Sequence, residues 1–179
     1  MAFVGQLRAE SRLPAQCEGS TPCWEFDLGY QLDFRVVQEF EGVGPRSRRV
    51  LNFAHGGYPQ YGDFQFALVL AFQRGDSLVA AVGLPVARAR SGRWVFCAEP
   101  ERFPELRAVA KRVQFREPVR AAVAGPDVGT GAFATLLEMR PGVTSCAHGV
   151  DAEDLIATYR ADASPKLQRI IETSSPAAQ

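Results

Sequence analysis

The chain has 179 residues, about the length of one domain, so a tandem of two full-sized domains is not expected. Hydrophobic residues make up 46% and charged residues 22%, a composition that excludes a disordered chain or a fibre. The 20 basic residues balance the 20 acidic ones, so no overall field directs the protein to nucleic acid or to an anionic membrane. We expect a single domain over residues 1–179, with a disordered tail at 174–179.

The N-terminal residues and the cysteines bear on the compartment. The opening MAFV is interrupted by Gly5 and then by polar residues, so it is too short for the apolar core of a secretory signal. The longest apolar run, at 66–72, is far shorter than the roughly 20 residues that cross a bilayer. The four cysteines are predicted to be free thiols, because a chain of this size needs no disulfide to hold its core. We therefore expect a cytoplasmic protein.

A long β-strand is predicted at 24–36. Apolar and polar residues alternate there without a break, which is the period of a strand with one buried and one solvated face. The apolar positions are Trp24, Phe26, Leu28, Tyr30, Leu32, Phe34 and Val36.

Two further strands, at 63–72 and 78–86, are predicted to form a hairpin around the turn at 74–76. In the first strand both alternating rows are largely apolar, so we expect it to be covered on both faces. A second turn, at 90–93, leads into another strand that begins at Trp94.

The periodicity changes after residue 98. Apolar residues three and four positions apart, with Pro104 suited to a first helical turn, predict a helix over 99–112. Alternation returns at 113–123, where Pro118 indicates an edge strand or a bulge and Glu117 occupies an apolar position of the pattern. A last strand is predicted at 133–139.

The C-terminal part is predicted to be helical. Leu155 and Ile156 follow Asp151 at helical spacing. Ser164 and Pro165 are typical of the start of a second helix. In total we expect an α+β, β-rich fold with a mostly antiparallel sheet of about seven or eight strands, barrel-like or a sandwich. One mid-chain helix and the C-terminal helices would pack on it.

Residues suited to catalysis or metal binding are few. The densest cluster is Cys146 with His148, which lacks the paired spacing of a zinc site and the sequence context of a nucleophile. No glycine-rich nucleotide motif is present. We expect no metal and no cofactor. An enzyme that uses His55, or Cys146 with His148, is the last of three functional hypotheses.

The segment 52–62 is the preferred ligand-contact loop. Its glycines permit close approach of a ligand and its tyrosines offer a flat surface with a hydroxyl group. A wide turn would require the same residue types, so this alternative stays open. The candidate ligand-binding residues are His55, Gly56, Gly57, Tyr58 and Tyr61.

The neutral total hides two regions of opposite charge. Residues 17–42 carry six acids and one arginine, whereas residues 86–120 carry nine bases and four acids. This segregation favours association with an oppositely charged surface, although cross-strand ion pairing on one sheet face would use the same residues. The candidate interaction surface comprises Glu25, Asp27, Asp33, Arg88, Arg90, Arg93, Trp94, Arg112, Arg116 and Arg120.

The leading hypothesis is a non-catalytic cytosolic binding or assembly module that acts through these charge-complementary surfaces. The partner would be a protein or a second copy of the chain. Nucleic acid is not favoured, because aromatic platforms are not interleaved with the arginines, and no membrane partner is expected. The alternative is a small-molecule carrier that holds an apolar ligand in a barrel or sheet cavity. Its lining would be Phe26, Tyr30, Phe34, Phe64, Phe66 and Trp94.

Overall fold

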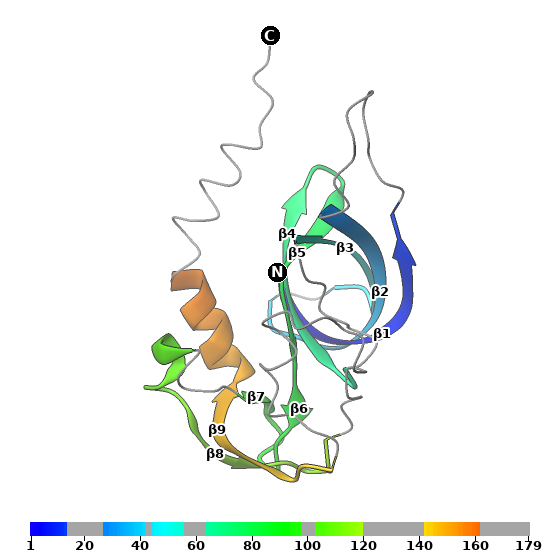
Figure 1. The fold of residues 1–179 in the computed structure, drawn as a ribbon. Helices are drawn as coiled ribbons and strands as arrows, with labels where there is room; N and C mark the ends of the chain where they lie inside the picture. The colour runs from blue at the N-terminus through cyan, green and yellow to red at the C-terminus, as the bar shows by residue number, and fades with distance from the viewer. Residues whose placement is uncertain (14–26, 42–43, 56–63, 98–102, 120–141, 162–179) are drawn as a thin grey trace.

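The computed structural model describes residues 1–13, 27–41, 44–55, 64–97, 103–119 and 142–161 (Figure 1). Within these residues, nine strands form two sheets. One α-helix occupies residues 152–161. The fold is β-rich, as the sequence predicts, and part of it is a closed barrel.

Five strands form the barrel. They are β1 (Ala2–Arg12), β2 (Asp27–Glu39), β3 (Ser47–His55), β4 (Ala67–Arg74) and β5 (Ser77–Pro85). Their order is β1-β2-β3-β5-β4, and β1 closes the barrel by pairing with β4. All neighbours are antiparallel except β3 and β5. This is a five-stranded Greek-key barrel, the architecture of the OB-fold, which by itself assigns no function.

Side chains fill the interior of the barrel. Alternate residues of β2 point inward, and Leu32 and Phe34 are fully buried there, as the period-two pattern predicts. Phe34 meets Phe3 of β1 edge to face, with ring centroids 5.8 Å apart. The buried interior residues are Phe3, Leu32, Phe34, Val50, Ala67, Val69 and Ala71.

The predicted hairpin is formed by β4 and β5, and its first strand is covered on both faces. Ala67 and Val69 of β4 lie inside the barrel, whereas Leu68 and Leu70 point outward into a second core. Gly75 in the connecting turn has a φ of +56°, a backbone conformation that residues with a Cβ atom rarely adopt. The strand assignment and the turn at 74–76 are therefore confirmed.

The second sheet has the order β6-β7-β9-β8. Its strands are β6 (Ala87–Arg88), β7 (Trp94–Cys97), β8 (Lys111–Gln114) and β9 (Ser145–Asp151). A bridge between Ala89 and Phe115 returns the end of β8 to β6, so the sheet curls on itself. Its inner face encloses Ala89, Val95, Cys97, Val113, Phe115, Val119 and Cys146.

A shared core joins the barrel, the second sheet and the helix at 152–161 (Figure 1). Val4 and Leu68 on the outside of the barrel pack in one cluster with Phe96 of β7. Leu155 and Ile156 of the helix are buried in the same cluster, at the spacing that the sequence predicts. The part of the barrel's outer surface that β1 and β4 form is thus an interior surface of the molecule.

The helix predicted over 99–112 is wrong in its described part. From residue 103 the chain makes a single 3-10 turn, η2 (Pro104–Leu106), and then enters β8. Phe103 at the start of the turn provides no side-chain cap. Lys111 pairs with Gly149 of β9, so strand pairing takes residues that a helix would need.

Strands β1, β3 and β9 were not predicted from the pattern. The N-terminal half of β1 is buried on both faces, because Phe3 lies inside the barrel and Val4 lies in the shared core. It therefore shows no alternation of apolar and polar residues. The described residues do not include 120–123 of the strand predicted at 113–123, the strand predicted at 133–139, the second C-terminal helix or the tail at 174–179. At 116–119 the chain is not in a strand, so that part of the prediction is wrong.

Cys97 and Cys146 form a disulfide, so the prediction of free thiols is wrong for this pair. They lie on the neighbouring strands β7 and β9 with Cα atoms 5.9 Å apart, within the usual span of a disulfide. Cys17 and Cys23 lie outside the described residues. Disulfides persist mainly in oxidising compartments, so the argument from free thiols to the cytosol is lost. No helix in the described ranges is long and apolar enough to span a membrane.

Candidate functional site

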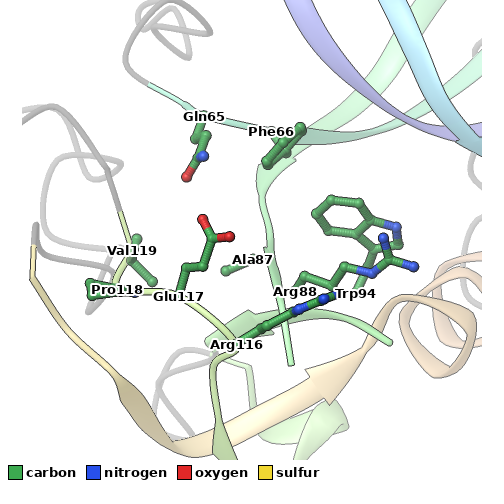
Figure 2. A pocket seen from close by; sticks show the side chains of 9 residues that line it. All are labelled: Gln65, Phe66, Ala87, Arg88, Trp94, Arg116, Glu117, Pro118 and Val119. Atoms are coloured by element: carbon green, nitrogen blue, oxygen red, sulfur yellow. The ribbon is translucent and has the colours of Figure 1, made fainter. Parts of the chain in front are cut away.

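A hollow of about 170 Å³ lies where the chain entering β4 faces β6, β7 and residues 116–119 (Figure 2). Phe66 and Trp94 form one wall, and their ring centroids are 4.9 Å apart. Pro118 and Val119 form the opposite wall, and Ala87 lies between the two. Apolar surface thus lines the middle of the hollow, at the junction of the two sheets.

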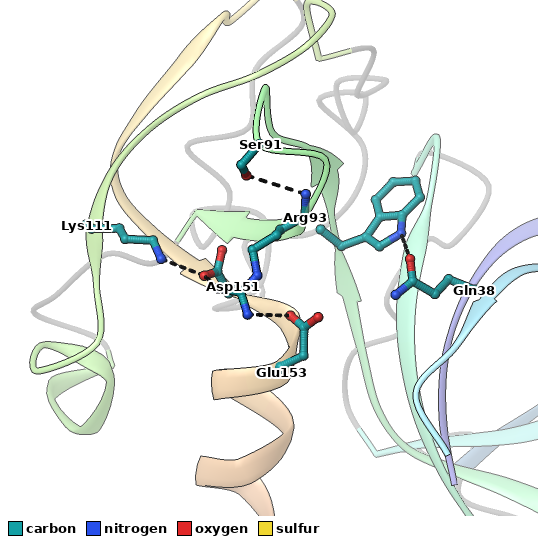
Figure 3. Close-up of polar contacts among 7 residues, drawn as sticks. Gln38, Ser91, Arg93, Lys111, Asp151 and Glu153 are labelled. Atoms are coloured by element: carbon teal, nitrogen blue, oxygen red, sulfur yellow. Dashed lines mark hydrogen bonds and ion pairs between the residues drawn. The ribbon is translucent and has the colours of Figure 1, made fainter. Parts of the chain in front are cut away.

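Trp94 is held in place from two sides. Its indole Nε1 donates a hydrogen bond to Oε1 of Gln38 in β2, at 2.9 Å (Figure 3). The guanidinium carbon of Arg88 stands 5.5 Å from the centroid of the indole. Arg88 is oriented in turn by a hydrogen bond from its Nε to the carbonyl of Gly92, at 3.0 Å. The aromatic wall is therefore rigidly supported by both sheets.

Charges of both signs line the rim of the hollow. The carboxylate of Glu117 points toward Gln65, whereas Arg88 and Arg116 extend on the side of Trp94 (Figure 2). The backbone N–H of Arg116 donates to the carbonyl of Arg88 at 2.8 Å, which sets these residues directly opposite each other. In the part of the chain that the structure describes, the side chains of Arg116 and Glu117 have no hydrogen-bond or ion-pair partner.

The two arginines at the rim belong to a larger basic surface. The backbone N–H of Arg90 donates to the carbonyl of Gln114, so the pairing of β6 with the end of β8 continues. Val113 and Phe115 point into the curled sheet, which leaves the residues between and beside them on the outer face. We call the exposed residues Arg88, Arg90, Arg112 and Arg116 the arginine seam.

Two residues of the predicted interaction surface instead form ion pairs within the chain. Asp33 pairs across the barrel sheet with Arg49, from Oδ1 to Nε at 2.9 Å. Arg93 pairs with Asp151, from Nη1 to Oδ2 at 2.6 Å (Figure 3). Both residues thus have an oppositely charged partner within the chain, and for Asp33 it is a cross-strand partner of the kind that the alternative describes. Trp94 is only 3% exposed and is not part of a surface.

The remaining residues of that predicted surface are placed only in part. Asp27 is the first residue of β2. Glu25 and Arg120 lie outside the described residues. Of the basic residues in the predicted surface, the four of the arginine seam are the ones that the structure describes as exposed and without an acidic partner among the described residues.

Asp151 forms a structural clamp rather than a reactive site. Its Oδ2 accepts hydrogen bonds from Arg93 and from Nζ of Lys111, each at 2.6 Å, and its side chain is 2% exposed (Figure 3). Arg93 directly precedes β7, Lys111 begins β8 and Asp151 ends β9. Among the described residues no cluster of histidine, cysteine and acidic side chains could hold a metal ion.

The structure describes only residues 52–55 of the predicted ligand-contact loop, and these belong to strand β3. His55 is the last residue of β3. Gly56, Gly57, Tyr58 and Tyr61 lie outside the described residues. Of the other candidate catalytic residues, Cys146 is bonded to Cys97, so its sulfur is not a free nucleophile beside His148.

The aromatic residues assigned to a carrier cavity do not share one space. Tyr30, Phe34 and Phe64 pack with the barrel interior. Phe66 and Trp94 lie outside the barrel, and they line the hollow. Phe26 lies outside the described residues.

Sequence reasoning missed Gln65, Glu117, Pro118 and Val119 as residues of one site. One signal was present, because Glu117 stands at an apolar position of its alternating segment. The alternation ends with β8, however, and Glu117 lies exposed in a bend at the rim of the hollow, so this signal alone does not place it in a site.

No family model matches the chain, and no curated protein and no solved structure is detectably similar to it. Function must therefore be argued from the geometry of the described residues.

Proposed function

We propose that this protein is a non-catalytic binding module whose arginine seam takes an acidic segment of a protein partner. The observation that carries the proposal is the direct opposition of Arg88 and Arg116 on paired strands, with Arg90 and Arg112 on the same face. Like charges directly opposite each other destabilise a sheet. Carboxylates supplied by a partner would convert this repulsion into paired, charge-assisted hydrogen bonds.

Two arginines of the barrel, Arg48 and Arg49, differ from the seam because they have acidic partners, whereas Arg8, Arg12, Arg35 and Arg74 have none among the described residues. Arg48 donates from Nε to Glu39 at 2.8 Å, and Arg49 donates to Asp33 at 2.9 Å. In the described ranges Arg90, Arg112 and Arg116 have no such acidic neighbour. The seam is thus an uncompensated basic surface on a chain whose formal net charge is zero.

The ion pairs within the chain favour a separate protein, and not a second copy of the chain, as the partner of the seam. Glu39 and Asp33, from the acidic region, are already paired with arginines of β3. Glu41 is paired with the ammonium group of Met1 and with Arg160. All three carboxylates of residues 17–42 whose side chains the structure describes are thus already paired within the chain.

An acidic protein is also favoured over single-stranded nucleic acid. Sites for single strands combine a basic groove with exposed aromatic faces on which bases stack. Trp94, which Arg88 covers, is buried, and Phe115 beside Arg116 is buried as well. The seam therefore offers charge without a stacking platform.

The test is a titration with a fluorescent peptide rich in glutamate and aspartate, repeated over a salt series. The variant Arg90→Gln/Arg112→Gln should bind roughly tenfold more weakly, because two charge-assisted contacts are removed. Arg49→Gln, which removes a positive charge from the barrel, serves as the control and should bind like the parent protein.

Three results would overturn the proposal. The first is equal affinity of the seam variant and the parent protein for the peptide. The second is tighter binding of a single-stranded oligonucleotide than of the peptide. The third is a concentration-dependent dimer that the seam variant abolishes, measured by size-exclusion chromatography with light scattering, which would assign the seam to self-association.

The carrier hypothesis is a weaker second proposal. It needs space for an apolar ligand, and the described barrel interior is filled by contacts such as that of Phe3 with Phe34. Native mass spectrometry of protein purified from cells would test it directly, since a retained apolar ligand adds mass.

A further inference from the structure

We infer that the hollow in Figure 2 binds a zwitterion whose ammonium and carboxylate groups are separated by a short apolar spacer. Three features meet in this space: an acidic side chain on one side, arginines on the other, and apolar walls between them. The inference goes beyond binding of an acidic segment, because that function gives no role to Glu117 or to Gln65.

Glu117 forms the end of the hollow that would receive a cation. Its carboxylate is directed into the space and toward Gln65 (Figure 2). No described residue pairs with it. An ammonium group placed there can donate to the carboxylate of Glu117 and to the side-chain oxygen of Gln65.

Arg116 and Arg88 form the end that would receive an anion. They are directly opposite on paired backbone, and Arg88 is oriented by Trp94 and by the carbonyl of Gly92. A carboxylate between two guanidinium groups accepts charge-assisted hydrogen bonds from both. It would also remove the repulsion between the opposed arginines.

The walls between the two ends suit an aliphatic spacer. Phe66 and Trp94 face Pro118 and Val119 across the hollow, with Ala87 between them (Figure 2). The volume of about 170 Å³ compares with the roughly 150 Å³ cavity that holds a benzene molecule. The space therefore suits a chain of a few methylene groups. Two sources share this chemistry, namely a free ω-amino acid and the C-terminal lysine residue of a protein.

The test is an NMR titration of isotope-labelled protein with 6-aminohexanoate, hexanoate, hexylamine and glycine. The indole N–H of Trp94 reports on the aromatic wall, and the variant Trp24→Phe removes the other indole signal of the chain. Only 6-aminohexanoate carries both charges at the ends of a spacer. It should shift the Trp94 signal to saturation with an affinity roughly tenfold higher than that of any of the other three.

Two variants assign the effect to the hollow. Glu117→Gln should weaken binding of 6-aminohexanoate roughly tenfold, to the level of hexanoate, because the partner of the ammonium group is lost. Arg49→Gln changes an arginine of the barrel that does not line the hollow, and it should leave the affinity unchanged. Glu117→Gln should not weaken binding of the acidic peptide, so failure of this inference can be told apart from failure of the proposed function.

The remaining comparison identifies the source of the ligand. A short peptide that ends in lysine is titrated beside the same peptide with an amidated C-terminus. Tighter binding of the free-carboxylate peptide than of 6-aminohexanoate indicates a protein tail, and the reverse indicates a free ω-amino acid. Equal affinity for hexanoate and 6-aminohexanoate, no shift with any ligand, or tighter zwitterion binding by Glu117→Gln would overturn the inference.

Discussion

Trp94 and Gln38 are joined by a hydrogen bond of 2.9 Å from the indole Nε1 to the side-chain Oε1, which connects β7 of the second sheet to β2 of the barrel. The donor belongs to a residue that is 3% exposed. Water therefore cannot readily replace the acceptor if it is lost. The same bond orients the aromatic wall of the hollow, so stability and the shape of the candidate site depend on one contact.

Gln38→Ala should lower the free energy of unfolding by about 1 to 3 kcal/mol, because it leaves a buried indole N–H without an acceptor. Urea denaturation measures the change. Gln31→Ala, on the same strand, is the control and should stay within about 0.5 kcal/mol of the parent protein. Equal stability of the two variants would contradict the role given to the Trp94 bond.

Gly149→Ala should destabilise the second sheet by about 1 to 3 kcal/mol through overpacking. A Cβ atom at this position would lie 2.6 Å from Cγ2 of Val113 and 2.8 Å from Cγ1 of Val95, closer than such atoms approach in folded proteins. Thermal denaturation measures the effect. Adding Val113→Ala should remove part of the clash, so the double variant should lose less stability than the sum of the single changes.

Asp151→Asn should lower the free energy of unfolding by about 2 to 4 kcal/mol, because a buried carboxylate that serves two cations is neutralised. Arg93 and Lys111 keep about half of their side chains exposed, which places the loss below that of a fully buried pair. Asp33→Asn breaks the exposed pair with Arg49 and should cost at most about 1 kcal/mol. Similar losses in the two variants would show that the burial of Asp151 contributes nothing.

Reduction of the Cys97–Cys146 disulfide should lower the free energy of unfolding by about 4 kcal/mol, since the bond closes a loop between residues 49 positions apart. Denaturation with and without dithiothreitol measures the loss. Peptide mapping without reductant should recover Cys97 joined to Cys146. Pairing of either residue with Cys17 or Cys23 would contradict the arrangement of β7 and β9.

The elements that the sequence predicts well have one dominant local signal. In β2 the inward positions include Tyr30, Leu32 and Phe34, and their alternation with polar residues leaves one choice of buried face. The turn between β4 and β5 is marked by Gly75, whose positive φ explains the residue type. Local chemistry alone decides these features.

The elements that the sequence does not predict depend on distant partners. Leu106 and Val109 have helical spacing, yet they bury their side chains from a turn because β9 pairs with the chain at Lys111. The segment of Cys146 and His148 has little strand propensity and becomes a strand between β7 and β8. These strands pair with residues far away in the sequence, so a short segment considered alone cannot predict them.

The sequence indicates which types of residue form the candidate site. It does not indicate which of them lie next to each other in the folded chain. The arginines of the seam were identified from charge, whereas the opposition of Arg88 and Arg116 follows from the bridge between Ala89 and Phe115. Phe66 and Trp94 were grouped correctly as neighbours, but in the wrong cavity. Only the closure of the barrel shows that their side of β4 faces outward.

The part of β4 at 67–71 packs between two cores, so the polarity of its residues cannot define which face is which. Its register is encoded by size: Ala67 and Ala71 face the narrow interior of the barrel, and Leu68 and Leu70 face the shared core. A slip by one residue would keep every apolar residue buried and would still fail, because leucines would overfill the barrel. In this strand, volume carries the information that alternating polarity carries elsewhere.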